Sequence, residues 1–100
     1  MGIFDLFGSK KKKLAAFQSR GAVILDVRTR EEYDLGAIPN AKHIALDVLP
    51  SKISEVKNWN KPVIAYCEKG GRSEKAANLL QANGVEVING GGYSWLSKHL

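Results

Sequence analysis

One segment of the chain decides its fold and points to its chemistry: PVIAYCEKGGRS, residues 62–73. Its first five residues form an apolar run typical of a buried strand, and a helical pattern follows from Ser73 to Asn83. Cys67, the only cysteine of the chain, lies at the turn between them. A helix N-terminus offers unpaired backbone N–H groups and the positive end of its dipole, so this position favours a thiolate.

The alternative interpretation of Cys67 is a small buried core residue, because free cysteine is among the most buried residue types. The flanking residues favour the reactive interpretation. Gly70 and Gly71 let the backbone turn tightly and bring its N–H groups to one point. Lys69 and Arg72 add two positive charges near the sulfur. We therefore predict a cradle for an anion, with Cys67 as the catalytic nucleophile.

The predicted cradle is a ring of backbone N–H groups, and two side chains are expected to act with it. Lys69 and Arg72 are predicted to steer and bind an anionic ligand, although Arg72 fits equally well a structural role in closing the loop. We expect the side chain of Glu68 to point to solvent, because a negative charge beside the sulfur would raise its pKa. The predicted substrate-binding residues are Glu68, Lys69, Gly70, Gly71, Arg72 and Ser73.

The composition narrows the class of protein. One hundred residues make one domain, and an apolar fraction of 44% supports a real core. A single cysteine excludes an internal disulfide and indicates a reducing, cytoplasmic compartment. We expect no signal peptide and no membrane span, since the apolar runs are short. The net charge of +5 favours anionic ligands or acidic partners, but no pattern typical of nucleic-acid binding accompanies it.

Strand and helix signals alternate along the chain, which predicts an α/β fold with a parallel sheet covered on both faces. The expected strands are residues 22–27, 42–46, 62–66 and 85–88, the last one broken by the glycines 90–92. The expected helices are residues 14–20, 29–35, 47–59, 73–83 and 93–100. Thr29 and Glu32 form a capping box, and Pro50 is expected in a first helical turn. Ligands of such sheets bind at the carboxyl ends of the strands, where Cys67 and residues 26–28 lie.

The first thirteen residues read as an N-terminal appendage to a domain of residues 14–100. Four apolar residues precede the basic run Lys10–Lys13. This pattern fits weak contact of residues 3–13 with an anionic membrane surface, or docking on this domain or on a partner. We favour docking, because four apolar side chains bury little area in a membrane. The apolar residues are Ile3, Phe4, Leu6 and Phe7.

Three stretches taken together resemble the rhodanese family, over residues 14–100. They are LDVR (25–28) with EEY (31–33), GAIPNA (36–41), and CEKGGRS (67–73) with the residues that follow it. The resemblance implies a central parallel sheet of about five strands with helices on both faces. The chain departs from the family pattern at two positions. Ala37 stands for the usual histidine and Asn40 for the second glycine, which bears on substrate preference.

The resemblance implies a sulfurtransferase of the thiosulfate (rhodanese) type. Sulfane sulfur would move from thiosulfate or a persulfide donor to a thiol or cyanide through a persulfide on Cys67, with Lys69 and Arg72 stabilising the leaving sulfite. Asp26 and Arg28 are expected to support the strand ends rather than to touch substrate. No cofactor is expected, and no metal either, because His43 and His99 lack metal-ligand spacing.

Two alternatives stay open. A persulfide carrier or binding module would load sulfur on Cys67 and deliver it only to a specific protein partner. A phosphatase or arsenate reductase would share the fold, but related phosphatases carry five residues between the cysteine and the arginine. This chain has four between Cys67 and Arg72, and the tighter ring suits a single sulfur atom. We expect a monomer with a small anionic sulfur donor and a thiol, cyanide or protein acceptor.

Overall fold

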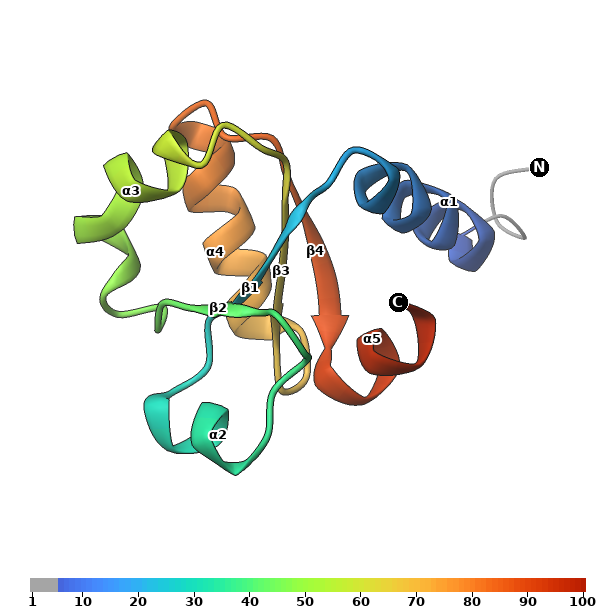
Figure 1. Ribbon diagram of the computed structural model, residues 1–100, viewed down its shortest axis with the longest axis horizontal. Helices are drawn as coiled ribbons and strands as arrows, with labels where there is room; N and C mark the ends of the chain where they lie inside the picture. Colours follow the sequence, from blue (N-terminus) through green and yellow to red (C-terminus); the bar gives the residue numbers. More distant parts are fainter. Residues whose placement is uncertain (1–5) are drawn as a thin grey trace.

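A parallel sheet of four strands forms the centre of the protein within residues 6–100, which the computed structural model describes (Figure 1). The strand order is β2-β1-β3-β4. The strands are β1 (Val23–Asp26), β2 (Lys42–His43), β3 (Val63–Cys67) and β4 (Val87–Gly92). The helices are α1 (Leu6–Ser19), α2 (Arg30–Leu35), α3 (Ile53–Asn58), α4 (Gly71–Ala82) and α5 (Tyr93–His99), with a 3₁₀ helix, η2 (Leu49–Lys52), before α3.

This arrangement confirms the expected α/β fold, with four strands where the family resemblance implied about five. All strand pairs are parallel, and Asp26 at the end of β1 lies opposite Tyr66 near the end of β3. Strand β3 lies between β1 and β4, and all five of its residues are buried. This explains the continuous apolar run at residues 62–66, since strands covered on both faces do not alternate in polarity.

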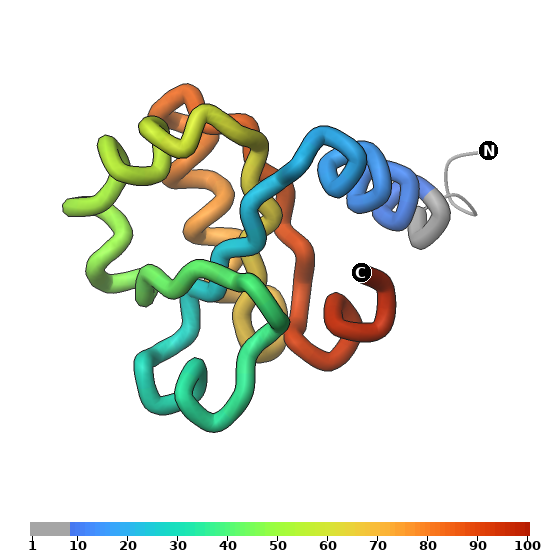
Figure 2. The backbone as a smooth tube through the Cα atoms, viewed as in Figure 1, coloured from blue at the N-terminus to red at the C-terminus, as the bar shows by residue number. Residues whose placement is uncertain are grey.

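Strand β3 divides its side chains between two apolar layers. Val63, Ala65 and Cys67 pack with α3 and α4 on one face, whereas Ile64 and Tyr66 pack with α1 and α5 on the other. Figure 2 shows α1 and α5, from opposite ends of the chain, on the same side of the sheet. The first layer also contains Leu25, Val27, Leu49, Val56, Ala76, Ala77 and Leu80. The second also contains Leu14, Ile38, Ala41 and Leu96.

The end of the last strand differs from the expectation. The glycines 90–92 were expected to break the strand, but β4 continues through them. Gly90 is an extra residue at the point where the pairing with β3 shifts register. A Cβ at Gly90 would lie 2.9 Å from Cγ2 of Ile64, and Gly91 has a φ of 88°. The glycines therefore allow a close-packed bulge within β4 rather than ending it.

Two further elements are shorter than expected. Strand β2 contains only Lys42 and His43, although the N–H of Leu46 still donates to the carbonyl of Val27, so the irregular chain keeps following β1. The helix expected at 47–59 is divided into η2 and α3. Pro50 lies at the start of η2, as expected, and the backbone of Lys52 leaves helical geometry between the two pieces.

Helix α1 begins earlier than the expected helix at 14–20. It runs without a break from Leu6 through Lys10–Lys13 to Ser19, so the division between residues 13 and 14 stays a prediction. The ammonium group of Lys10 lies 4.1 Å from the centre of the Trp95 ring, which links α1 to α5. The expected docking of Ile3, Phe4, Leu6 and Phe7 falls on residues or side chains outside the described part. In the described part, no helix combines the length and hydropathy that a membrane span requires.

Shortening a fully buried side chain of α4 should destabilise the fold. We expect Leu80→Ala to lower the free energy of unfolding by about 2–5 kcal/mol, because Leu80 is fully buried and its removal leaves a cavity. Leu35→Ala is the matched control, since Leu35 is 92% exposed and should change stability by less than about 0.5 kcal/mol. Urea unfolding of both variants tests this. Equal losses in the two variants would contradict the packing described above.

Candidate active site

The sulfur of Cys67 lies at the junction of β3 and α4. The N–H of Gly70 donates to Sγ at 3.0 Å and the N–H of Ser73 at 3.4 Å. Gly70 is the N-cap residue of α4, with a φ of 103°, and has no side chain to cap the helix. The sulfur takes that place, because it accepts the N–H of the third residue of the helix. Two N–H groups of the predicted ring thus point at the candidate nucleophile.

These contacts shift the ionisation of the thiol. Burial raises the pKa of Cys67, but hydrogen bonds from the Ser73 hydroxyl and from the backbone of Ser73, Gly70 and Lys69 outweigh it. The net pKa of the thiol is below its ordinary value. Donors that point at the sulfur stabilise the charged form more than the neutral form. The geometry therefore supports a thiolate, as the sequence led us to expect.

Asn89 supports the loop from β4, and its role did not emerge from the sequence. Its Oδ1 accepts from the Ser73 hydroxyl at 2.7 Å and from the Gly91 N–H at 2.9 Å. Its Nδ2 donates to the carbonyl of Gly70 at 3.1 Å. One amide thus ties the β4 bulge to the turn beside Cys67. The only sequence signal was its place directly before the glycine run.

The side chain of Arg72 forms an ion pair with Glu32 of α2. Its two terminal nitrogens donate to the two carboxylate oxygens of Glu32 at 2.7 and 2.9 Å. Glu32 also accepts the backbone N–H of Thr29, which completes the expected capping box of α2. The Arg72 guanidinium and the Thr29 N–H lower the pKa of Glu32 to about 2. This geometry favours the loop-closing role of Arg72, and the part of Glu32 in it was not expected.

Arg28 and Asp26 form a buried pair behind the loop. The guanidinium donates to both Asp26 oxygens, the shortest contact being 2.7 Å, and to the carbonyl of Gly36 at 2.7 Å. A further nitrogen of Arg28 lies 3.2 Å from the carboxylate of Glu68. Glu68 was expected to point to solvent, but its side chain is half exposed and paired. Arg28 and Asp26 thus bond each other at the end of β1, and their supporting role stays a prediction.

A pocket of about 340 Å³ opens over the sulfur. Its charged residues are two carboxylates and two cations, and Lys69 is the exposed cation among them. Ala37 is half-buried, and Asn40 has a φ of 68°, a left-handed conformation that asparagine tolerates better than most residues. The departure from glycine at position 40 therefore leaves the turn intact. The pocket is lined by Glu32, Cys67, Glu68, Lys69, Gly71 and Arg72.

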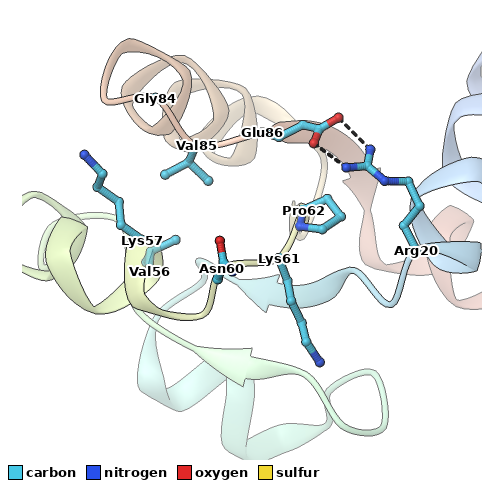
Figure 3. A pocket seen from close by; sticks show the side chains of 9 residues that line it. All are labelled: Arg20, Val56, Lys57, Asn60, Lys61, Pro62, Gly84, Val85 and Glu86. Carbon is cyan, nitrogen blue, oxygen red and sulfur yellow. Dashed lines mark hydrogen bonds and ion pairs between the residues drawn. The ribbon is translucent and has the colours of Figure 1, made fainter.

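A second pocket lies away from the sulfur, near the amino-terminal ends of β3 and β4 (Figure 3). Its volume is about 350 Å³, and the ion pair of Arg20 with Glu86 bridges one side of it. Neither a cysteine nor a histidine lines it. Across the described residues, no cluster of three or more His, Cys, Asp or Glu side chains is arranged to hold a metal ion.

The family model of the rhodanese-like domain matches residues 10–98. The chain belongs to the rhodanese-like domain family. The thiosulfate sulfurtransferase GlpE of Coxiella burnetii is 33% identical over 82% of this chain and 78% of its own. The putative sulfur carrier protein YrkF of Bacillus subtilis is 40% identical over 66% of this chain. The chain spans 36% of YrkF and 64% of YqhL, an uncharacterized protein of the same organism that is 38% identical over 79% of this chain.

A solved structure agrees with this assignment. A rhodanese-like domain protein from Staphylococcus aureus is 38% identical, with a TM-score of 0.69. The similarity covers 76% of this chain and 74% of that one. The rhodanese-like fold expected from the three sequence stretches is therefore confirmed.

Removing the hydroxyl donor at the sulfur should raise the pKa of Cys67. We expect Ser73→Ala to shift the pH profile of thiol alkylation to higher pH. The Ser73 hydroxyl lies 3.4 Å from Sγ and shares its one proton between Asn89 and the sulfur, so its removal weakens the stabilisation of the thiolate. The measurement is the rate of iodoacetamide labelling against pH, followed by intact mass. Ser51→Ala changes an exposed serine whose hydroxyl bonds only a local carbonyl and should leave the profile unchanged. A wild-type pKa at or above that of free cysteine would contradict the geometry.

The Arg72–Glu32 pair should make stability depend on pH in acid. Ionised Glu32 stabilises the folded state fully above the ordinary pKa of 4.5, and this stability is lost as the pH falls toward the folded value of about 2. We expect wild type to exceed Glu32→Gln in urea midpoint at neutral pH, and the difference to vanish near pH 2. Glu31→Gln, the exposed neighbour, should show a much smaller difference. A difference that is independent of pH would contradict the pairing.

Proposed function

We propose that this protein is a sulfurtransferase that carries sulfane sulfur as a persulfide on Cys67. The observation that carries the proposal is the sulfur of Cys67 at the N-terminus of α4, where it accepts N–H groups at 3.0 and 3.4 Å and has a lowered pKa. Membership of the rhodanese-like family and the relative named thiosulfate sulfurtransferase support it. The partners are then a sulfur donor and a sulfur acceptor, and we propose the cytoplasm as the compartment.

The reaction divides into two displacements at sulfur. The Cys67 thiolate attacks the sulfane sulfur of thiosulfate or of a persulfide, the bond within the donor breaks, and sulfite or a thiolate leaves. The terminal sulfur then lies close to the N–H groups of Gly70 and Ser73, which stabilise its negative charge. An acceptor thiolate or cyanide attacks that terminal sulfur, and Cys67 leaves as the thiolate with which the cycle began. The hydrogen bonds to Sγ favour the ionised nucleophile, so the proposed mechanism uses no general base.

The buried sulfur also gives weight to a second candidate, a persulfide carrier. Cys67 is 1% exposed, so an acceptor that fits over the pocket would reach the sulfur more readily than an arbitrary thiol. The relative named a putative sulfur carrier is consistent with this. Turnover with small thiols favours the enzyme, whereas a stable persulfide that only a protein acceptor discharges favours the carrier.

The phosphatase or arsenate reductase alternative is weaker. A phosphate dianion in the loop would require the guanidinium beside it, but both terminal nitrogens of Arg72 are held by Glu32. Hydrolysis of a chromogenic phosphate ester would restore this alternative.

Mass spectrometry tests the proposal directly. We expect wild type to gain the mass of one sulfur atom when the reduced protein is incubated with thiosulfate or with cysteamine persulfide, and Cys67→Ser to gain none under the same conditions. Ser51→Ala should gain sulfur like wild type, because its side chain bonds only a local carbonyl. No gain with either donor, for a folded and reduced wild type, would overturn the proposed function.

A further inference from the structure

The charged groups around Cys67 are almost fully paired with one another. Glu32 holds both terminal nitrogens of Arg72. Arg28, behind the loop, donates to Asp26, Glu68 and the Gly36 carbonyl, so its guanidinium has little donor capacity left for a ligand. The chain has an excess of positive charge, but the guanidinium groups near the sulfur are paired with carboxylates and do not attract a ligand strongly.

The pocket is net negative when Cys67 is the thiolate that attacks the donor. Two carboxylates oppose the two cations that line it, and the thiolate adds a further negative charge. Lys69 is the lining cation that forms no ion pair within the described residues. One exposed ammonium group is strongly hydrated and weakly attractive to an anion. A small dianion such as thiosulfate therefore gains little on entry and meets repulsion.

A neighbouring apolar surface points in the same direction. A pocket of about 300 Å³ shares Arg72 with the site and is lined otherwise by Val27, Thr29, Ala45, Leu46 and Asp47. Val27, Ala45 and Leu46 are apolar, and Asp47 is an acid, so this surface suits carbon groups and disfavours anions. Thiosulfate has no carbon group that could use it, whereas an organic donor does.

We propose that Glu32 and Glu68 are specificity-determining residues that select, as the sulfur donor, an organic persulfide whose carbon group carries no negative charge, against small dianions. This rests on the proposed function of Cys67. The thiolate attacks the outer sulfur of R–S–SH, the bond between the two donor sulfurs breaks, and R–S⁻ leaves and takes a proton from water. Cys67 is left as the persulfide, and no further oxidant or reductant is required.

The test uses three persulfides that differ mainly in the charge of their carbon group, those of cysteamine, mercaptoethanol and mercaptopropionate, together with thiosulfate. The rate of persulfide formation on wild-type Cys67 is followed by intact mass. We expect the persulfides of cysteamine and mercaptoethanol to react faster than that of mercaptopropionate, whose carbon group carries a carboxylate, and thiosulfate to be slowest. Added salt should speed the reaction of thiosulfate, because it screens repulsion, and should change that of cysteamine persulfide much less.

Two variants assign the selectivity to the carboxylates. Glu68→Gln and Glu32→Gln should each raise the rate with thiosulfate relative to cysteamine persulfide about fivefold, the order expected for one charge a few ångströms away in a watery pocket. Glu86→Gln is the matched control, because it removes the same charge from the distant pocket of Figure 3. Its ratio of rates should equal that of wild type. Glu68 is half exposed, so its variant tests the inference even if Glu32→Gln unfolds.

The outcomes separate the two proposals. If thiosulfate reacts as fast as cysteamine persulfide in wild type, or if neither carboxylate variant changes the ratio of rates, the inference on the donor is wrong while the persulfide function stands. If no donor adds sulfur to Cys67, the proposed function fails and the inference fails with it.

Discussion

The buried guanidinium of Arg28 is the interaction on which the surroundings of the sulfur depend. It lies at the carboxyl end of β1 and is 2% exposed. It donates to Asp26 at the end of β1, to the Gly36 carbonyl after α2, and to Glu68 in the loop after Cys67. The centre of the Tyr93 ring lies 4.7 Å from the guanidinium carbon, and this contact connects the start of α5 to Arg28. A buried charge tolerates loss of its partners poorly, so these four segments are held in one arrangement.

Within that frame, one set of backbone groups serves both the fold and the chemistry. The N-terminus of α4 needs an acceptor for its first N–H groups, and its N-cap residue, Gly70, has no side chain. The Cys67 sulfur accepts the N–H of Ser73 in the first turn and that of Gly70, so donors at the helix end also stabilise the thiolate. Close packing of β4 maintains this position, because a Cβ at Gly92 would lie 2.7 Å from the Glu68 carbonyl oxygen.

The parts of this design that were predictable from the sequence are local in the chain. The strand, turn and helix around Cys67 and the capping box of α2 each arise within a few residues, where pattern and propensity act directly. The Arg72–Glu32 contact joins residues forty positions apart, and no local signal couples them. The glycine run 90–92 is ambiguous locally, because glycine serves a bulge as well as a strand end. The packing of Gly90 against Ile64 and Leu96, which lie elsewhere in the chain, favours the bulge.

Net charge was also a poor guide to the site, and the reason is general. An excess of +5 describes the field far from the protein, but a ligand in the pocket meets charges a few ångströms away. Four of the basic residues, Lys10–Lys13, lie on α1, whereas the guanidinium groups beside the sulfur are neutralised by carboxylates. Those carboxylates hold the loop in shape. Under the proposed donor selection, the same ion pairs also reduce the attraction for small dianions.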